Sequence, residues 1–218
     1  MKRGLQMNIG VIGAGAMGKP IAAQFAAAGH DVILANSRGP ESLQDFAKST
    51  GLTAGTRFDA AKADIIVLAV RWENQAAALS DLDLTGKILI DVTNQMEKGD
   101  LPENRGSLLL QSHFPDTKIV KAFNTLYAQY LDGNTTGARR FLAFAGDDDD
   151  AKNTVKAIFS AMGYYPYDVG SLALGNATME FGAVLSAQHF TVPNDKTLTQ
   201  VLVKANDGSW ELQVKESE

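Results

Sequence analysis

The clearest chemical signal in the chain is a run of six residues with the pattern Gly-x-Gly-x-x-Gly. They are Gly13, Ala14, Gly15, Ala16, Met17 and Gly18. At this spacing the first glycine permits a tight turn and the second lets a pyrophosphate approach the backbone. The third lets a helix pack closely on a strand. The pattern therefore predicts a dinucleotide site in which the first helical amides face the phosphates.

The residues around this run supply the elements that such a site requires. An apolar segment, Ile9 to Ile12, precedes the glycines, helix-forming sequence follows them up to Ala28, and a second apolar run covers Val32 to Ala35. The order strand, glycine turn, helix, strand is the context in which the pattern binds a dinucleotide. The alternative to a dinucleotide site is that the glycines form a purely structural turn.

The residues after the second strand indicate which dinucleotide to expect. They read Asn36, Ser37 and Arg38, without the Asp or Glu that usually holds the ribose 2′-hydroxyl of NAD. The guanidinium of Arg38 can pair with a 2′-phosphate, and the Ser37 hydroxyl can donate to it. We therefore expect NADP(H). The alternative is a solvated arginine in a turn that ends at Pro40.

The remaining pattern predicts a Rossmann-type, doubly wound α/β fold with a mainly parallel sheet. The apolar run in residues 64–70 suits a strand buried on both faces, and further strands are expected over residues 87–92, 118–123 and 140–145. Residues just past the ends of such strands face a ligand crevice. The positions expected there are Trp72, Thr93, Asn94, Asn124 and Thr125. Trp72 either walls the cofactor or caps the core.

The C-terminal part of the sequence predicts a small appendage. Residues 1–170 are expected to form the dinucleotide-binding domain, and residues 171–218 a lobe with a last helix from Leu174 to Phe190. Two alternating segments around Asn206, Asp207 and Gly208 predict a β-hairpin. A polar loop is expected over residues 95–105.

An acidic run, Asp147 to Asp150, allows two interpretations. It forms either a metal site or the first turn of a helix through Met162, where acids complement the helix dipole. Four consecutive carboxylates point in different directions around a helix, which favours the helix start. No metal site is assigned.

Composition limits the partners, the chemistry and the location that we expect for this protein. The 20 basic and 25 acidic residues of the 218 give a net charge of −5 without a basic stripe, so nucleic acid is not an expected partner. The chain has no cysteine, which excludes thiol catalysis and disulfides. Apolar runs are too short for a membrane span, and the start lacks the apolar core of a signal peptide. We expect a cytoplasmic protein.

Five short motifs together resemble the coenzyme F420-dependent NADP oxidoreductase family. They are G-A-G-A-M-G (13–18), A-A-G-H-D-V (27–32), N-S-R-G-P (36–40), K-A-F-N-T (121–125) and A-G-D-D (145–148). The resemblance covers about residues 7 to 190. It implies hydride transfer between NADP(H) and the deazaflavin F420, or a flavin, as small-molecule co-substrate.

The resemblance also implies roles for particular residues. The glycine loop from Ala14 to Met17 would hold the pyrophosphate, and Ser37 with Arg38 the 2′-phosphate. The nicotinamide would be surrounded by Val70, Trp72, Thr93, Asn94 and Asn124, with Asn124 and Thr125 toward the acceptor. No residue is assigned as a catalytic acid or base, since hydride transfer between two rings needs positioning above all.

Two departures from the family concern the acceptor side. Archaeal members have His where this chain has Asn124, and an apolar tail where this chain has the hairpin after Pro193. Because family members commonly pair through their C-terminal regions, the resemblance implies a homodimer. Two other functions remain open: an NADPH-binding redox sensor, and a reductase of a small carbonyl or imine, although such reductases usually carry a larger helical C-terminal domain.

Overall fold

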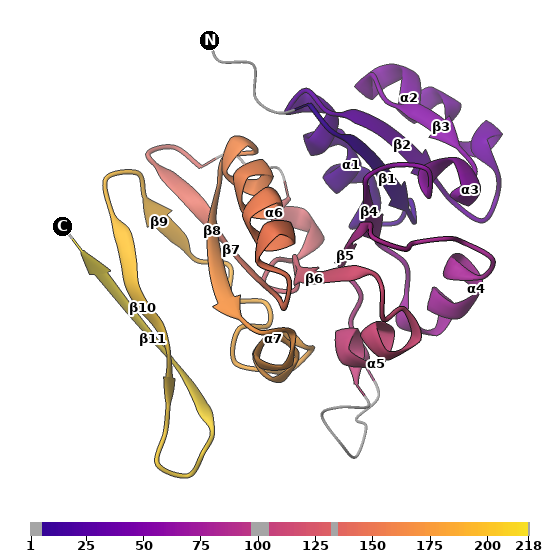
Figure 1. Ribbon diagram of the computed structural model, residues 1–218. Helices are drawn as coiled ribbons and strands as arrows, with labels where there is room; N and C mark the ends of the chain where they lie inside the picture. Colours follow the sequence, from indigo (N-terminus) through magenta and orange to yellow (C-terminus); the bar gives the residue numbers. More distant parts are fainter. Residues whose placement is uncertain (1–5, 97–104, 132–134, 218) are drawn as a thin grey trace.

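The fold is built on one large β-sheet, seen in a computed structural model that describes residues 6–96, 105–131 and 135–217 (Figure 1). The expected loop over residues 95–105 falls mostly outside these ranges. The strands of the sheet are β1 (Asn8–Ile12), β2 (Asp31–Ala35), β3 (Thr53–Gly55), β4 (Ile65–Leu68), β5 (Ile88–Asp91), β6 (Lys118–Ala122), β7 (Ala138–Gly146), β8 (Tyr164–Gly170) and β9 (Thr191–Pro193).

The strand order confirms the predicted fold class. It runs β3-β2-β1-β4-β5-β6-β7-β8, with β9 paired to β7. Each neighbouring pair from β3 to β6 is parallel, while β7 is antiparallel to β6. The first six strands therefore have the Rossmann order, in which the chain reverses its winding between β1 and β4 and opens a ligand crevice there.

Helices cover both faces of the sheet. They are α1 (Gly18–Ala27), α2 (Gln44–Thr50), α3 (Arg57–Ala60), α4 (Gln75–Leu79), α5 (Gly106–His113), α6 (Asp149–Ala161) and α7 (Leu172–Met179), with short 3₁₀ turns η1 (Pro40–Leu43), η2 (Trp72–Asn74) and η4 (Ala128–Tyr130). Buried residues of α1, α2 and α6 share one core cluster with alternate strand residues, and those of α3, α4 and α5 share the other.

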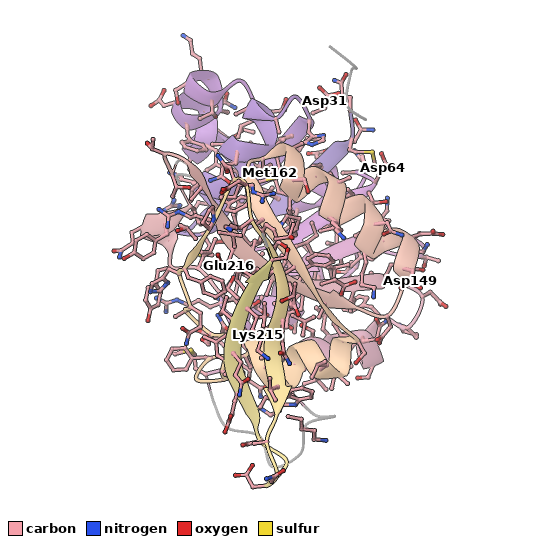
Figure 2. All side chains as sticks on the ribbon, turned by 90° about the vertical axis from the view of Figure 1, so that its left-hand side faces the viewer. Asp31, Asp64, Asp149, Met162, Lys215 and Glu216 are labelled. Atoms are coloured by element: carbon pink, nitrogen blue, oxygen red, sulfur yellow. The ribbon has the colours of Figure 1, made fainter. Side chains whose placement is uncertain are left out.

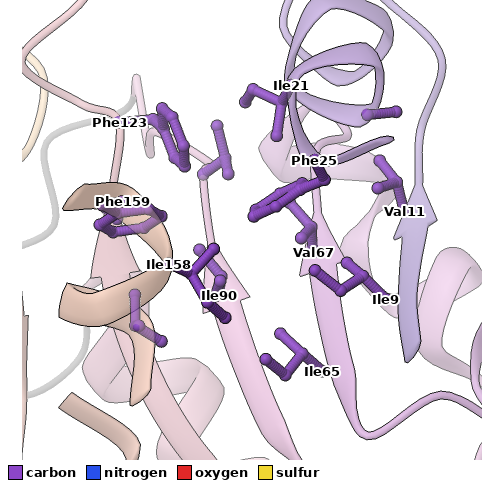
Figure 3. Packing of buried hydrophobic residues seen from close by; sticks show 14 of the residues in the cluster. Ile9, Val11, Ile21, Phe25, Ile65, Val67, Ile90, Phe123, Ile158 and Phe159 are labelled. Atoms are coloured by element: carbon purple, nitrogen blue, oxygen red, sulfur yellow. The ribbon is translucent and has the colours of Figure 1, made fainter. Parts of the chain in front are cut away.

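The alternation along each strand explains this layering. Ile65 and Val67 pack with the helices of one face, and Ile66 and Leu68 with those of the other. Figure 3 shows Phe25 of α1 and the α6 residues directed toward the strands of the first face. Because both faces of the sheet are covered, the central strand β4 is apolar throughout, as the sequence pattern predicted.

The acidic run begins helix α6, as expected. Asp148 is the N-cap, and its Oδ1 accepts a hydrogen bond from the Ala151 amide at 2.8 Å. Asp149 and Asp150 lie in the first turn. Among the described residues, no cluster of three or more His, Asp or Glu side chains is placed to hold a metal ion.

The last helix is shorter than predicted. The sequence pattern gave a helix from Leu174 to Phe190, but α7 ends at Met179. Glu180 leaves the helix with an extended backbone, and its carboxylate is buried beside Lys121. Two residues further on, Gly182 adopts a positive φ of 84°. The apolar residues after Met179 therefore pack as turns, which periodicity alone did not distinguish from a helix.

The predicted hairpin is present as β10 (Thr197–Lys204) and β11 (Trp210–Ser217). It lies along the β8 side of the molecule, and its tip extends past α7 in Figure 1. The Leu198 amide donates to the Tyr165 hydroxyl at 2.8 Å, and Val201 is buried against the strands. Figure 2 faces this side, with Lys215 and Glu216 on β11 toward the viewer.

The segments after residue 170 contact the main sheet at several places, since β9 pairs with β7 and α7 packs on β7. The proposed boundary at residue 170 stays a prediction. Within the described ranges, no helix combines the length and the apolar character needed to span a bilayer.

Candidate cofactor site

A groove of about 900 Å³ lies at the carboxyl ends of β1, β2 and β4. Its size fits a nucleotide-sized ligand. The residues that line it are Ile12, Gly13, Ala14, Gly15, Ala16, Met17, Ala35, Asn36, Ser37, Arg38, Arg57, Ala69, Val70, Arg71, Asn74, Ala77 and Ala78. The structure therefore brings together the glycine loop, the turn after β2 and the end of β4, as the sequence predicted.

The three glycines have different surroundings. A Cβ on Gly13, whose φ is +112°, would lie 2.2 Å from the Ala69 carbonyl oxygen, and one on Gly18 would lie 1.9 Å from the Gly13 carbonyl oxygen. A Cβ on Gly15 would have no atom within 4 Å. The first and third glycines are thus required by the packing of the turn and helix. Only Gly15 faces open space, which is the arrangement needed for a ligand to approach the backbone.

The start of α1 is available to an anion. Its N-cap, Met17, makes no side-chain capping hydrogen bond, and the first turn contains no acidic residue. The first amides of a helix lack partners within the helix and carry the positive end of its dipole. Amides at the start of α1 can therefore bind phosphate oxygens in the groove.

The turn after β2 is shaped by Asn36. Its Oδ1 accepts a hydrogen bond from the Arg38 amide at 2.9 Å, and its Nδ2 donates to Ser42 Oγ at 2.9 Å. Ser42 Oγ also donates to the Gly39 carbonyl oxygen at 2.8 Å. Asn36 thereby fixes the backbone of the turn, while Ser37 and Arg38 are exposed at the groove.

Two arginines of the groove were not singled out from the sequence. Arg57 follows β3 and Arg71 follows β4, and both line the groove with Arg38. The signal that could have revealed them is their position just past the carboxyl ends of parallel strands. Three arginines that follow three different strands thus line one groove, in a chain whose net charge is −5.

The other predicted residues lie outside the groove lining. Trp72 is half-buried, and Thr93, Asn124 and Thr125 are buried. Asn124 Nδ2 donates to Asn94 Oδ1 at 2.7 Å and to the Thr93 carbonyl oxygen at 3.0 Å. The structure therefore links the ends of β5 and β6, and the involvement of these residues in binding stays a prediction.

The turn after β6 carries unpaired acceptor atoms and backbone strain. Phe123 has a φ of 69°, which is rare for a bulky residue. Among the described residues, neither Asn124 Oδ1 nor Thr125 Oγ1 has a hydrogen-bond partner, although both are buried. Unsatisfied buried polar atoms are uncommon and often mark places where a ligand completes the bonding.

Beneath this turn lies a buried polar network that the sequence did not reveal. Lys121 Nζ lies 2.6 Å from Glu180 Oε1, with the two side chains 0% and 3% exposed. Asp91 Oδ2 accepts from Ser107 Oγ at 2.6 Å, and Asp91 Oδ1 accepts from Thr93 Oγ1 at 2.7 Å. The network joins β5, β6, α5 and α7. The sequence signal for this network is Lys121, a lysine that lies between apolar residues of strand β6.

Fold and groove define the class: a Rossmann-type α/β protein with a glycine-rich loop at the start of its first helix. Residues 8–95 match the family model described as "NADP oxidoreductase coenzyme F420-dependent". The chain belongs to this family, as its sequence motifs indicated.

Similar proteins agree with this assignment. The structure of hypothetical protein SMa0349 from Sinorhizobium meliloti superposes with a TM-score of 0.76 at 34% identity, covering 88% of this chain and 97% of that one. A protein of Arthrobacter sp. FB24, named provisionally as an F420-dependent NADP reductase, gives a TM-score of 0.68 at 25% identity, with 78% and 87% covered.

A curated relative is longer than this chain. Metalloreductase STEAP3 of Rattus norvegicus is 32% identical over 168 residues, which are 76% of this chain and 34% of that protein. The chain thus spans about a third of the length of this relative.

Proposed function

We propose that this chain binds NADP(H) in the groove beside the glycine loop and supports hydride transfer between the nicotinamide and a deazaflavin or flavin. The observation that carries the proposal is the contrast within the glycine pattern. Gly13 and Gly18 have no room for a side chain, whereas Gly15 faces open space at the start of an uncapped helix. Family membership supports the choice of NADP and of an oxidoreductase.

Different residues of the groove would bind different parts of the cofactor. Amides of the glycine loop from Ala14 to Met17 would hold the pyrophosphate. Ser37 and Arg38, exposed on a turn that Asn36 fixes, would hold the 2′-phosphate through charge-assisted hydrogen bonds. Val70, at the end of β4, lines the groove and would lie beside the nicotinamide end.

Asn94 and Asn124 would orient the reacting ring. When bound, the nicotinamide supplies the hydride chemistry, and the protein has to bring the donor and acceptor atoms of the two rings to about 3–3.5 Å of each other. The unpaired Oδ1 of Asn124 can accept a hydrogen bond from an amide N–H, and its Nδ2 is held by Asn94. These contacts would orient a carboxamide without moving a proton.

The identity of the acceptor is the open part of the proposal. A relative is named a metalloreductase. A hydride carries two electrons and a ferric ion accepts one, so a ferric substrate would need a flavin between them. This balance favours a flavin as the direct acceptor where iron is the final one.

The experiment follows NADPH oxidation with F420, FMN, FAD and riboflavin side by side, each with and without ferric citrate. We expect turnover with at least one of the four compounds. Tight NADPH binding without turnover in all eight mixtures would contradict the enzymatic proposal and favour a redox sensor.

A further inference from the structure

Arg57 occupies a defined place at one end of the groove. It follows β3, and Gly55 of that strand pairs with Ala35 of β2. Arg57 lies two residues after Gly55, and Ser37 lies two residues after Ala35. Both residues line the groove. Arg57 therefore lies beside the turn to which the 2′-phosphate is assigned. In NADP the adenine is attached to the same ribose as this phosphate, so Arg57 is at the adenine end.

The guanidinium of Arg57 is held in place by three contacts. Its central carbon lies 4.3 Å from the centre of the Phe58 ring, Nη1 donates to the Ser80 carbonyl oxygen, and Nη2 lies 3.7 Å from Asp81 Oδ2. The side chain is 28% exposed. An arginine fixed in this way loses little conformational freedom when a ligand arrives.

These contacts leave one part of the group for a ligand. One face of the plane covers Phe58, one N–H of Nη1 is donated to the Ser80 carbonyl oxygen, and the Asp81 carboxylate lies near Nη2. A phosphate would need the terminal N–H groups, and Asp81 already offsets part of the charge. The second flat face of the guanidinium carries none of these contacts. Ala77 and Ala78 of α4 line the groove with small side chains and leave room for a ring.

We propose that Arg57 is the adenine-stacking residue of the groove, with the adenine lying on the guanidinium face opposite Phe58. Planar guanidinium groups stack on aromatic rings as well as attracting them as cations. The proposal rests on the assignment of NADP(H) to this groove. It gives the two arginines separate tasks: Arg38 recognises the 2′-phosphate, and Arg57 binds the base that NADPH and NADH share.

The test uses calorimetric titration of NADPH, NADH and reduced nicotinamide mononucleotide, which lacks the adenosine. Arg57→Ala and Arg57→Met should weaken NADPH and NADH by the same factor, about tenfold. The ratio of the two affinities and the weak binding of the mononucleotide should stay unchanged. Arg57→Lys should fail to restore binding, since it keeps the charge but not the plane. Thermal melts establish that each variant folds.

Three results would overturn the assignment: unchanged affinity in Arg57→Ala, a loss confined to NADPH, or full recovery in Arg57→Lys. The loss confined to NADPH would show that Arg57 pairs with the phosphate instead. Failure of the unmutated protein to bind either dinucleotide would refute the proposed function itself. The two failures are therefore distinguishable.

Discussion

The ammonium of Lys121 lies 2.6 Å from Oε1 of Glu180, with both side chains removed from solvent. Glu180 Oε2 also accepts a hydrogen bond from the Gln95 amide at 3.1 Å, in the segment that follows Asn94. Gly106, at the start of α5, packs directly against this carboxylate, because a Cβ at this position would lie 1.9 Å from Glu180 Oε1. The pair therefore joins the end of α7 to the loops that carry the proposed nicotinamide residues.

Removal of one member of this pair should be strongly destabilising. Lys121→Met leaves the Glu180 carboxylate buried without its partner, which we expect to cost about 3–5 kcal/mol of unfolding free energy. The double variant Lys121→Met with Glu180→Leu should recover much of that loss, because neither member of the pair then remains as an unpaired buried charge. Urea denaturation measures both values.

Lys62→Met is the matched control, since Lys62 pairs with Asp59 at 2.9 Å on the surface, with side chains 76% and 42% exposed. Its effect should be much smaller. Equal losses in Lys121→Met and Lys62→Met would refute a special role for the buried pair.

The glycine loop gives a second prediction, based on two identical substitutions. Gly18→Ala places a methyl group 1.9 Å from the Gly13 carbonyl oxygen and should lower stability and NADPH binding together. Gly15→Ala adds the same group to open space, so the fold should be retained while NADPH binding falls. Thermal melts and NADPH titration separate the two effects. Unimpaired NADPH binding by Gly15→Ala would argue against pyrophosphate approach at this residue.

The capping of α6 predicts a pH dependence of stability. The hydrogen bond from the Ala151 amide holds the pKa of Asp148 below its ordinary range, with Lys118 adding to the effect. The stabilisation is present above the unfolded pKa and is lost as the pH falls through the folded one, so it should begin to decrease below about pH 4. At pH 7, Asp148→Ala should cost about 1 kcal/mol of unfolding free energy.

Asp150→Ala serves as the control for this cap, because the exposed Asp150 carboxylate is not the N-cap. Denaturant titrations at pH 7 and pH 3 provide the comparison. The gap between the unmutated protein and Asp148→Ala should narrow at pH 3. A gap of the same size at both values would contradict the capping account.

The hairpin leads to a prediction about assembly. Two-stranded hairpins are marginal alone, and this one packs on the chain's own β8 through β10. On β11, Val214 remains 41% exposed. We propose that the exposed part of β11 around Val214 pairs two copies of the chain in a homodimer. Val214→Asp should then halve the mass in solution, whereas Gln213→Asp, which replaces an exposed polar side chain of the same strand, should not. A monomeric unmutated protein would end this proposal.

Local sequence patterns were sufficient for most of the fold. The strand around Ile65 to Leu68 is apolar because both faces are covered, and the glycine pattern has steric causes that act within a few residues. The end of α7 could not be predicted in this way. It depends on the contact between Glu180 and Lys121, which are 59 residues apart in the chain.

The site was predictable to a similar extent. Asn36, Ser37 and Arg38 follow a strand next to the glycine loop, so their place at the groove could be inferred from sequence order alone. The position of Arg57 just after β3 could be inferred in the same way, but its orientation could not, since it depends on Ser80 and Asp81 after α4. The unpaired Oδ1 of Asn124 likewise depends on how Asn94 and the Thr93 carbonyl group occupy its amide nitrogen.

The central claim is that this groove binds NADP(H) through a 2′-phosphate site at Arg38. Its most direct test is the affinity of the unmutated protein and of Arg38→Ala for NADPH and for NADH, measured by calorimetry at one salt concentration. We expect NADPH to bind more tightly than NADH. Arg38→Ala should weaken NADPH by about 1.5–3 kcal/mol and leave NADH nearly unchanged. Equal affinities of the unmutated protein for the two cofactors, or no binding of either, would contradict the account.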